Sequence, residues 1–191
     1  TNGGSLLIGG GNLNPMTGPA DGGSAGPGAS ITHATLSTNG GSVDIKGRGS
    51  SAGIQLTSST LSTAGGSGNT GVINLSGEGT AGPGISIIDS TLDTNGGGIN
   101  LRGKGMDIGA EIKSVAANTT SRLRSFGGPI NLSGEATNTA CSSNCFGLNI
   151  LGAVEISSVT SGSNGPITLA GTHPAAVSNA IRVNLEAIKD Q

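Results

Sequence analysis

Ile99-Asn100-Leu101-Arg102-Gly103 is one copy of a phrase that returns along the chain: apolar, polar, apolar, polar or small, then Gly. The other copies begin at Val43, Ile73, Ile130 and Ile167, and Leu6-Leu7-Ile8-Gly9-Gly10 is a looser first copy. The copies from Val43 onward start 30, 26, 31 and 37 residues apart. Helical repeats keep a fixed length in order to stack, whereas variable turns between constant segments are typical of a coil of strands.

Two more strand-like segments follow most copies. The first is a triplet with apolar first and third residues, found at Ala29–Ile31, Ile54–Leu56, Ile85–Ile87, Ala110–Ile112, Val154–Ile156 and Ile181–Val183. The second is a Thr-Leu phrase that ends in paired glycines, found at Ala34–Gly41, Ser59–Gly66 and Ser90–Gly97. Because alternate residues of a strand face opposite sides, the pattern predicts an all-β parallel β-helix, a single segment over 1–191 with about six coils of three short strands.

The same alternation predicts the interior and the corners of this β-helix. The first and third residues of each triplet, mostly Ile, Leu and Val, are expected to face inward and to stack from coil to coil. We expect the 37 glycines to supply the positive φ that tight corners need. The Gly-x-Gly pairs at 47–49, 77–79 and 103–105 are interpreted as turns, since no helix follows them to form a phosphate site.

Composition argues against several classes of protein. Only 1% of the residues are aromatic and 33% are hydrophobic, few for a compact core, while the in-phase triplets argue against disorder. The net charge of −2 comes from scattered charges, which argues against nucleic-acid binding. No apolar run is long enough for a membrane span, and no signal-peptide pattern is present. The chain starts inside a repeat, at Thr1-Asn2-Gly3-Gly4, which indicates a piece of a longer solenoid.

Two cysteines lie close together in Cys141-Ser142-Ser143-Asn144-Cys145, within an insertion in the repeat. We expect a local disulfide, which would place the protein outside the reducing cytosol, and the alternative is a pair of free thiols. A zinc site would need two further ligands, and His33 and His173 are expected to lie in distant units.

Two columns of outward side chains are expected to stack along the coils. Charge alternates in the first column, which contains Arg48, Glu78, Lys104 and Glu135. With coils about 4.8 Å apart, opposite charges would be neighbours and would disfavour misaligned stacking, at about 0.2–1 kcal/mol for each exposed pair. The second column contains Asp44, Asn74, Asn100, Asn131 and Thr168, whose side chains can hydrogen-bond along the axis. The functional alternative for this second column is a ligand platform.

Two specific activities are considered and not favoured. Thr35, Thr60 and Thr91 recur at one position, as in the threonine arrays of ice-binding β-solenoids, but the array ends after three coils. A polysaccharide-processing enzyme needs converging acids, bases or nucleophiles, whereas the Asp residues occupy unlike repeat positions and the chain has no Trp or Tyr for sugar subsites. We therefore expect a protein without catalytic residues and without a metal.

The phrases Ser90–Leu101 and Gly71–Gly77 resemble the filamentous-haemagglutinin-like repeats of bacterial two-partner-secretion exoproteins, and the resemblance covers nearly the whole chain. It implies a right-handed parallel β-helix, exported through an outer-membrane transporter and secreted or displayed on the cell surface as an adhesin, with no cofactor. The implied partners are a host-cell receptor, a glycan, or a component of extracellular matrix or biofilm. The alternative is a passive spacer that holds a distal binding domain away from the cell.

An adhesin of this kind is expected to carry its specificity where insertions interrupt the repeat, because such loops project outward and leave the core intact. The spacing of the triplets predicts three inserted loops, at about 9–28, 117–126 and 136–152. Their candidate contact residues are Asn12, Asp21, Arg122, Arg124, Asn144 and Phe146.

Overall fold

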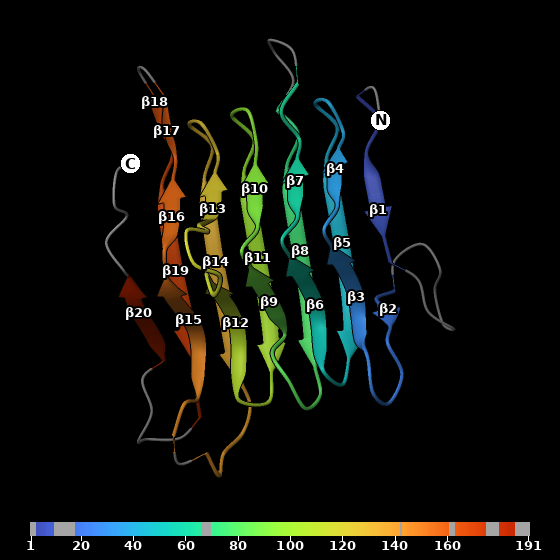
Figure 1. Cartoon of the computed structure of the whole chain (residues 1–191), viewed down its shortest axis with the longest axis vertical. Helices are drawn as coiled ribbons and strands as arrows, with labels where there is room; N and C mark the ends of the chain where they lie inside the picture. Colours follow the sequence, from blue (N-terminus) through green and yellow to red (C-terminus); the bar gives the residue numbers. More distant parts are fainter. Residues whose placement is uncertain are drawn as a thin grey trace.

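The computed structural model describes residues 3–9, 18–65, 70–141, 143–160, 163–174 and 180–185. Within these ranges every helical or extended element is a β-strand, and successive coils stack side by side along one axis, as Figure 1 shows. Three sheets result, and all strand pairs in them are parallel. The chain therefore folds as a parallel β-helix of about six coils, as predicted.

Each complete coil gives one strand to each sheet. Sheet A contains β1 (Leu6–Ile8), β5 (Val43–Gly49), β8 (Ile73–Gly79), β11 (Ile99–Gly105), β14 (Ile130–Ala136) and β19 (Ile167–Thr172), and β2 (Ala20–Asp21) also pairs with β5. Sheet B contains β3 (Pro27–Thr32), β6 (Ala52–Thr57), β9 (Ile85–Ile88), β12 (Ile108–Lys113), β15 (Phe146–Gly152) and β20 (Ile181–Leu185). Sheet C contains β4 (Thr35–Ser37), β7 (Thr60–Ser62), β10 (Thr91–Asp93), β13 (Ser121–Arg124) and β16 (Val154–Ser157). A short antiparallel pair, β17 (Val159–Thr160) and β18 (Ser163–Asn164), follows β16.

The core consists of columns of aliphatic side chains that stack in register. In sheet A, for example, Ile99 lies opposite Ile73 on one side and Ile130 on the other, and all three are fully buried. In sheet C, Leu92 lies between Leu61 and Leu123 in the same way. Each fully buried Ile or Leu stabilises the fold by about 1.5–3 kcal/mol, so these columns are the main source of stability.

The strands of sheet A are longer than predicted, because the Gly-x-Gly pairs are strand residues and not turns. They end β5, β8 and β11, and their glycines face the interior. The cause is close packing of two backbones: a Cβ on Gly103 would lie 2.1 Å from the carbonyl oxygen of Gly109 in sheet B. Positive φ is confined, among the described glycines, to Gly3, Gly23, Gly40, Gly96, Gly127 and Gly152. Most glycines near this corner are thus required by space and not by φ.

One triplet of the fifth coil was assigned to the wrong sheet. Val154–Ile156 was expected to be the sheet B segment, but it lies in β16 of sheet C, where Val154 pairs with Ser121. The sheet B segment of this coil is β15, whose Leu148 and Ile150 are buried and extend the column of Ala110 and Ile112. An apolar triplet alone does not specify its sheet; the coil-to-coil register does.

Candidate functional site

The outer face of sheet A carries the predicted column of amides. Asn74 Nδ2 donates to Asp44 Oδ1 at 2.7 Å, Asn100 Nδ2 donates to Asn74 Oδ1 at 2.9 Å, and Asn131 Nδ2 donates to Asn100 Oδ1 at 2.9 Å. All three amides donate toward the N-terminal coils, and the carboxylate of Asp44 accepts at the end of the chain of hydrogen bonds. Thr168 lies opposite Asn131 in the last coil. The predicted hydrogen bonding along the axis is therefore confirmed for Asp44, Asn74, Asn100 and Asn131.

Charged residues form a second column on the same face. Arg48 lies opposite Glu78, and Lys104 lies opposite both Glu78 and Glu135. Two of these neighbouring pairs are ion pairs. The distance is 3.7 Å between Arg48 Nε and Glu78 Oε2, and 3.1 Å between Lys104 Nζ and Glu135 Oε1. These side chains are about half exposed, so each pair contributes only about 0.2–1 kcal/mol.

Asp21 also belongs to this charged column. It was expected to lie in a long loop at 9–28, of which residues 10–17, including Asn12, lie outside the described ranges. Residues 20–21 instead return to sheet A as β2, where Asp21 pairs with Arg48. The alternation of sign thus begins one coil earlier than predicted. The continued alternation of sign was the signal in the sequence that could have revealed this.

Arg102 lies between the two columns and borders two open grooves. One groove, of about 370 Å³, is lined by Arg102 together with Lys104, Ser133, Glu135, Ala170 and Thr172. The other, of about 260 Å³, is lined by Arg102 together with Pro19, Lys46, Ser76, Glu78 and Lys104. Arg102 is exposed and forms no ion pair with the residues that the structure describes. Its guanidinium is available to an anion, which it can hold with two parallel hydrogen bonds.

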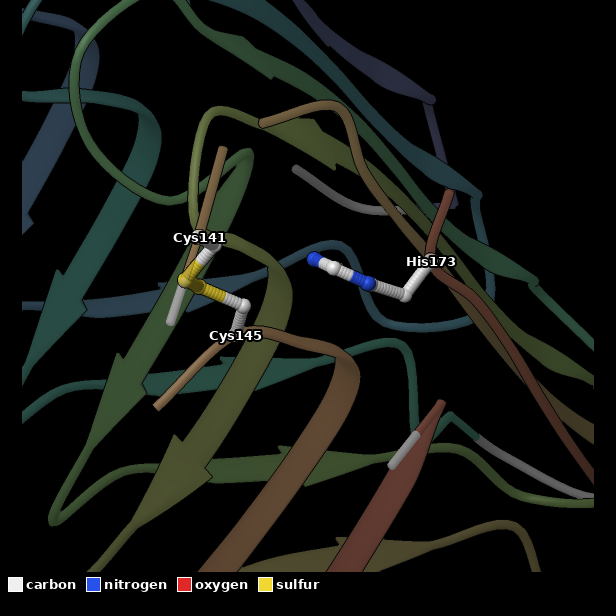
Figure 2. Close-up of side chains that lie close together, drawn as sticks. All are labelled: Cys141, Cys145 and His173. Atoms are coloured by element: carbon white, nitrogen blue, oxygen red, sulfur yellow. A yellow bond between two sulfur atoms is a disulfide. The ribbon is translucent and has the colours of Figure 1, made fainter. Parts of the chain in front are cut away.

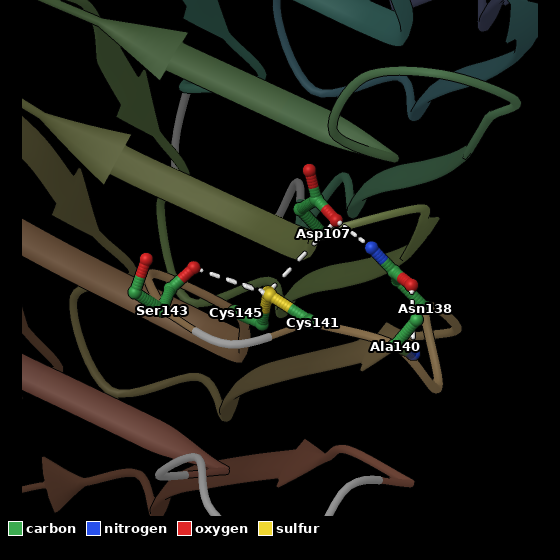
Figure 3. Close-up of a disulfide and its surroundings, with 6 residues drawn as sticks. All are labelled: Asp107, Asn138, Ala140, Cys141, Ser143 and Cys145. Carbon is green, nitrogen blue, oxygen red and sulfur yellow. Dashed lines mark hydrogen bonds between the residues drawn. A yellow bond between two sulfur atoms is a disulfide. The ribbon is translucent and has the colours of Figure 1, made fainter.

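A second candidate region is the loop of residues 137–145, which joins β14 to β15 and is called the A–B loop below. The predicted insertion at 136–152 was too long, because 146–152 form β15. Cys141 and Cys145 are joined by a disulfide within this loop, the pairing expected from their spacing (Figure 3). Cys145 is buried, and its Sγ lies 3.9 Å from Asp107 Oδ1. The same carboxylate oxygen accepts a 2.7 Å hydrogen bond from Asn138 Nδ2.

His173 lies beside this disulfide, so the prediction that it is distant was wrong. Its imidazole points toward the two sulfur atoms in Figure 2, and the ligand atoms of Cys141, Cys145 and His173 all lie within 4.8 Å of one another. The register explains the contact, since Glu135 is opposite Thr172 and the next residue therefore reaches the start of the A–B loop. Aligning the glycines at 134 and 171 in the sequence would have revealed this.

The third predicted loop, at 117–126, was wrong because residues 121–124 form β13. Arg122 and Arg124 are therefore side chains of sheet C. Arg122 Nε lies 3.2 Å from Glu155 Oε2, and Arg124 is opposite Asp93. Burial raises the pKa of Asp93, and the charge of Arg124 offsets part of that rise.

Phe146 and Asn144 have different surroundings. Phe146 is 8% exposed, and the guanidinium carbon of Arg182 lies 5.2 Å from the centre of its ring. It is therefore a packing residue and not an exposed contact. Asn144 is exposed in the A–B loop and has a φ of 61°.

The chain between β12 and β13, residues 114–120, forms a loop that we call the B–C loop. Asp89 of the preceding coil anchors it. Its carboxylate accepts hydrogen bonds from Thr119 Oγ1 at 2.6 Å, Val115 N at 2.9 Å, Ser114 Oγ at 2.9 Å and Ala116 N at 3.3 Å. Burial raises the pKa of Asp89, but these hydrogen bonds outweigh it, so that the pKa is lowered overall.

Comparison with family models, curated proteins and solved structures gives no match for this chain. Among the described residues there is no helix with the length and apolar character needed to cross a membrane. The resemblance to filamentous-haemagglutinin-like repeats therefore stays a prediction.

Proposed function

We propose that this chain is a non-enzymatic segment of a secreted or surface-displayed bacterial adhesin, and that the outer face of sheet A contacts an acidic glycan of a host cell, matrix or biofilm. The observation that carries the proposal is Arg102, an exposed cation that borders two grooves and forms no ion pair within the described part of the chain. A carboxylate or sulfate of a glycan would supply the missing anion. Export through an outer-membrane transporter belongs to the same proposal and rests on the resemblance alone.

The neighbours of Arg102 suit a polar ligand. Ser133 and Ser76 flank Arg102 in the same outward column and line the two grooves. The hydroxyl of Ser76 can donate to and accept from sugar hydroxyls, whereas that of Ser133 donates to the Leu101 carbonyl at 3.1 Å and can accept a hydrogen bond from a ligand. Since the chain has no Trp or Tyr to stack on a sugar ring, we expect weak binding at one site and useful avidity only from repeated contacts.

A spacer is the second candidate, and the amide column favours it. Asn74 and Asn100 each donate to one neighbouring coil and accept from the other, so these groups serve the rod itself. Four charged residues on this face also form two ion pairs, Arg48 with Glu78 and Lys104 with Glu135. A rod whose surface polar and charged groups bond to one another in this way needs no ligand.

An array of acidic and neutral glycans distinguishes these two functions. The wild-type chain is compared with Arg102→Ser, which introduces the residue found in the neighbouring coils, and with Arg122→Ser, which removes the same charge from sheet C. We expect binding to acidic glycans that Arg102→Ser abolishes and Arg122→Ser retains. If the wild-type chain binds no glycan on the array, the spacer is favoured. Equal binding by all three chains would exclude the Arg102 site.

A further inference from the structure

We propose that Cys141, Cys145 and His173 form a zinc site when the disulfide is reduced, with Asp107 as the fourth ligand. The inference goes beyond the proposed function and does not depend on it. Its basis is a set of four metal-binding side chains that three different coils bring to one corner of the β-helix. Oxidised and metal-bound forms would exclude each other, because a sulfur in a disulfide cannot be a thiolate ligand.

The separations of the ligand atoms fit a tetrahedral site. With Zn–S of about 2.3 Å and Zn–N or Zn–O of about 2.0 Å, ligand atoms in such a site lie about 3.3–3.8 Å apart. The donor atoms of the two cysteines and His173 already lie within 4.8 Å of one another, and Asp107 Oδ1 lies 3.9 Å from Cys145 Sγ. After cleavage of the S–S bond, the site requires the three clustered donor atoms to approach one another by about 1 Å, and Asp107, which neighbours Cys145, to turn toward the same ion.

The surroundings support the ligands in ways that a random surface cluster would not. His173 directly follows β19, and Asp107 lies in the bend between β11 and β12, so two ligands are attached to sheet strands. Asn138 Nδ2 donates to Asp107 Oδ1 at 2.7 Å, the kind of contact that orients a ligating carboxylate. Cys145 is fully buried, which shields one thiolate–metal bond from water.

Reduction of the disulfide needs one added reagent, a small-molecule dithiol. The dithiol supplies two electrons that break the Cys141–Cys145 bond, and two protons complete the two thiols while the reagent becomes a cyclic disulfide. Zn²⁺ then binds both sulfurs as thiolates, and two protons are released to solvent. A small-molecule disulfide reverses the sequence: it accepts two electrons and becomes two thiols, the Cys141–Cys145 bond forms again, and the ion is released.

Cobalt(II) and zinc binding to the full chain test the site. Cobalt(II) is added to reduced and to oxidised protein, and its visible and near-ultraviolet absorption is recorded; zinc affinity is then measured by competition with a coloured chelator. The variants are His173→Ala, Cys141→Ser and Asp107→Asn, with His33→Asn as the control that removes the other imidazole. His33 has a φ of 50°, which Asn tolerates.

The expected result is one metal ion per reduced chain, with thiolate-to-cobalt bands and tetrahedral visible bands, and no such spectrum from the oxidised chain. His173→Ala, Cys141→Ser and Asp107→Asn should each weaken zinc binding at least tenfold, since loss of a ligand costs no less than loss of a group that orients one, and His33→Asn should not weaken it. The proposal is overturned if reduced protein binds no better than oxidised protein. It is equally overturned if His173→Ala and His33→Asn bind zinc alike.

Discussion

Gly103 of β11 and Gly109 of β12 face each other across the corner between sheets A and B, so closely that a Cβ on Gly103 would lie 2.1 Å from the Gly109 carbonyl oxygen. A Cβ on Gly109 would in turn lie 2.1 Å from the backbone nitrogen of Glu135. The same contact recurs in the coils on either side, at Gly77 with Gly84 and at Gly134 with Gly147. Two glycine columns therefore let the two backbones meet without side chains between them.

Gly103→Ala should be among the most destabilising single changes in the chain. The added methyl group meets backbone, which cannot move aside as a flexible side chain can, so we expect a loss of about 3 kcal/mol or more in the free energy of unfolding. Gly98→Ala is the matched control, since its nearest contact would be 3.2 Å away, and it should cost about 1 kcal/mol or less. Urea denaturation measures both, and equal losses would contradict the close packing of this corner.

The amide column should contribute measurably to stability. Asn100→Ala removes one hydrogen bond to Asn74 and one from Asn131, so we expect a loss of about 1–2 kcal/mol. Thr168→Ala, at the end of the same column, removes an exposed side chain without such bonds in the described residues and should cost less than about 0.5 kcal/mol. Chemical denaturation of both variants tests this, and an Asn100→Ala chain as stable as Thr168→Ala would show that the amides do not stabilise the stack.

Asp89 and Asp93 should respond to pH in opposite directions. The pKa of Asp89 is lowered in the fold, so its stabilising contribution is present above the ordinary carboxyl pKa and is lost as pH falls through the lowered value. Asp89→Asn should therefore destabilise the protein at neutral pH, and the difference from wild type should shrink in acid.

The pKa of Asp93 is raised in the fold, so the charged carboxylate lowers the free energy of unfolding at pH values above this raised pKa. Asp93→Asn should accordingly gain stability at neutral pH, and the gain should vanish below the ordinary carboxyl pKa. Denaturation curves between neutral and acid pH measure both differences. Two variants that change in the same direction with pH would contradict the assigned surroundings.

Glu78→Lys should destabilise the chain in a salt-dependent way. The change puts a third cation beside Arg48 and Lys104, which lie on either side of Glu78 in register. Repulsion between exposed charges is screened by salt, so the drop in melting temperature should be larger at low than at high ionic strength. Thr168→Lys, which adds a cation on the same face opposite the uncharged Asn131, is a control for added charge. An equal drop at both ionic strengths would mean that the charged column does not act through electrostatics.

The sequence predicts which side chains form the columns of the core, but it does not predict how the backbones pack at the corners. The alternation in Ile73-Asn74-Leu75 and its copies specifies which side chains face inward, and the repeat fixes their stacking. The close approach of Gly103 and Gly109 is a long-range relationship, and a local reading of Gly-x-Gly as a turn misses it. The place of Leu148 in the sheet B column of the fifth coil was missed for a similar reason, since an insertion of unknown length precedes it.

The sites were predictable only in part. Alternating signs identified the charged column before its register was known, and close spacing indicated the disulfide. Arg122 was assigned to a loop because nothing in the local sequence shows that β13 resumes the leucine column after the B–C loop. The contact between His173 and Cys141 depends on how two coils stack, which the irregular repeat length conceals.

The most direct test of the proposed function is the affinity of wild-type and Arg102→Ser chains for a sulfated oligosaccharide, measured by titration calorimetry at low and at high salt. We predict that the variant binds at least tenfold more weakly at low salt, because a charge-assisted hydrogen bond is worth about 1.5–3 kcal/mol, and that salt weakens the wild type more than the variant. Equal affinities for the two chains, with Arg122→Ser also unchanged, would contradict the assignment of the binding face to sheet A.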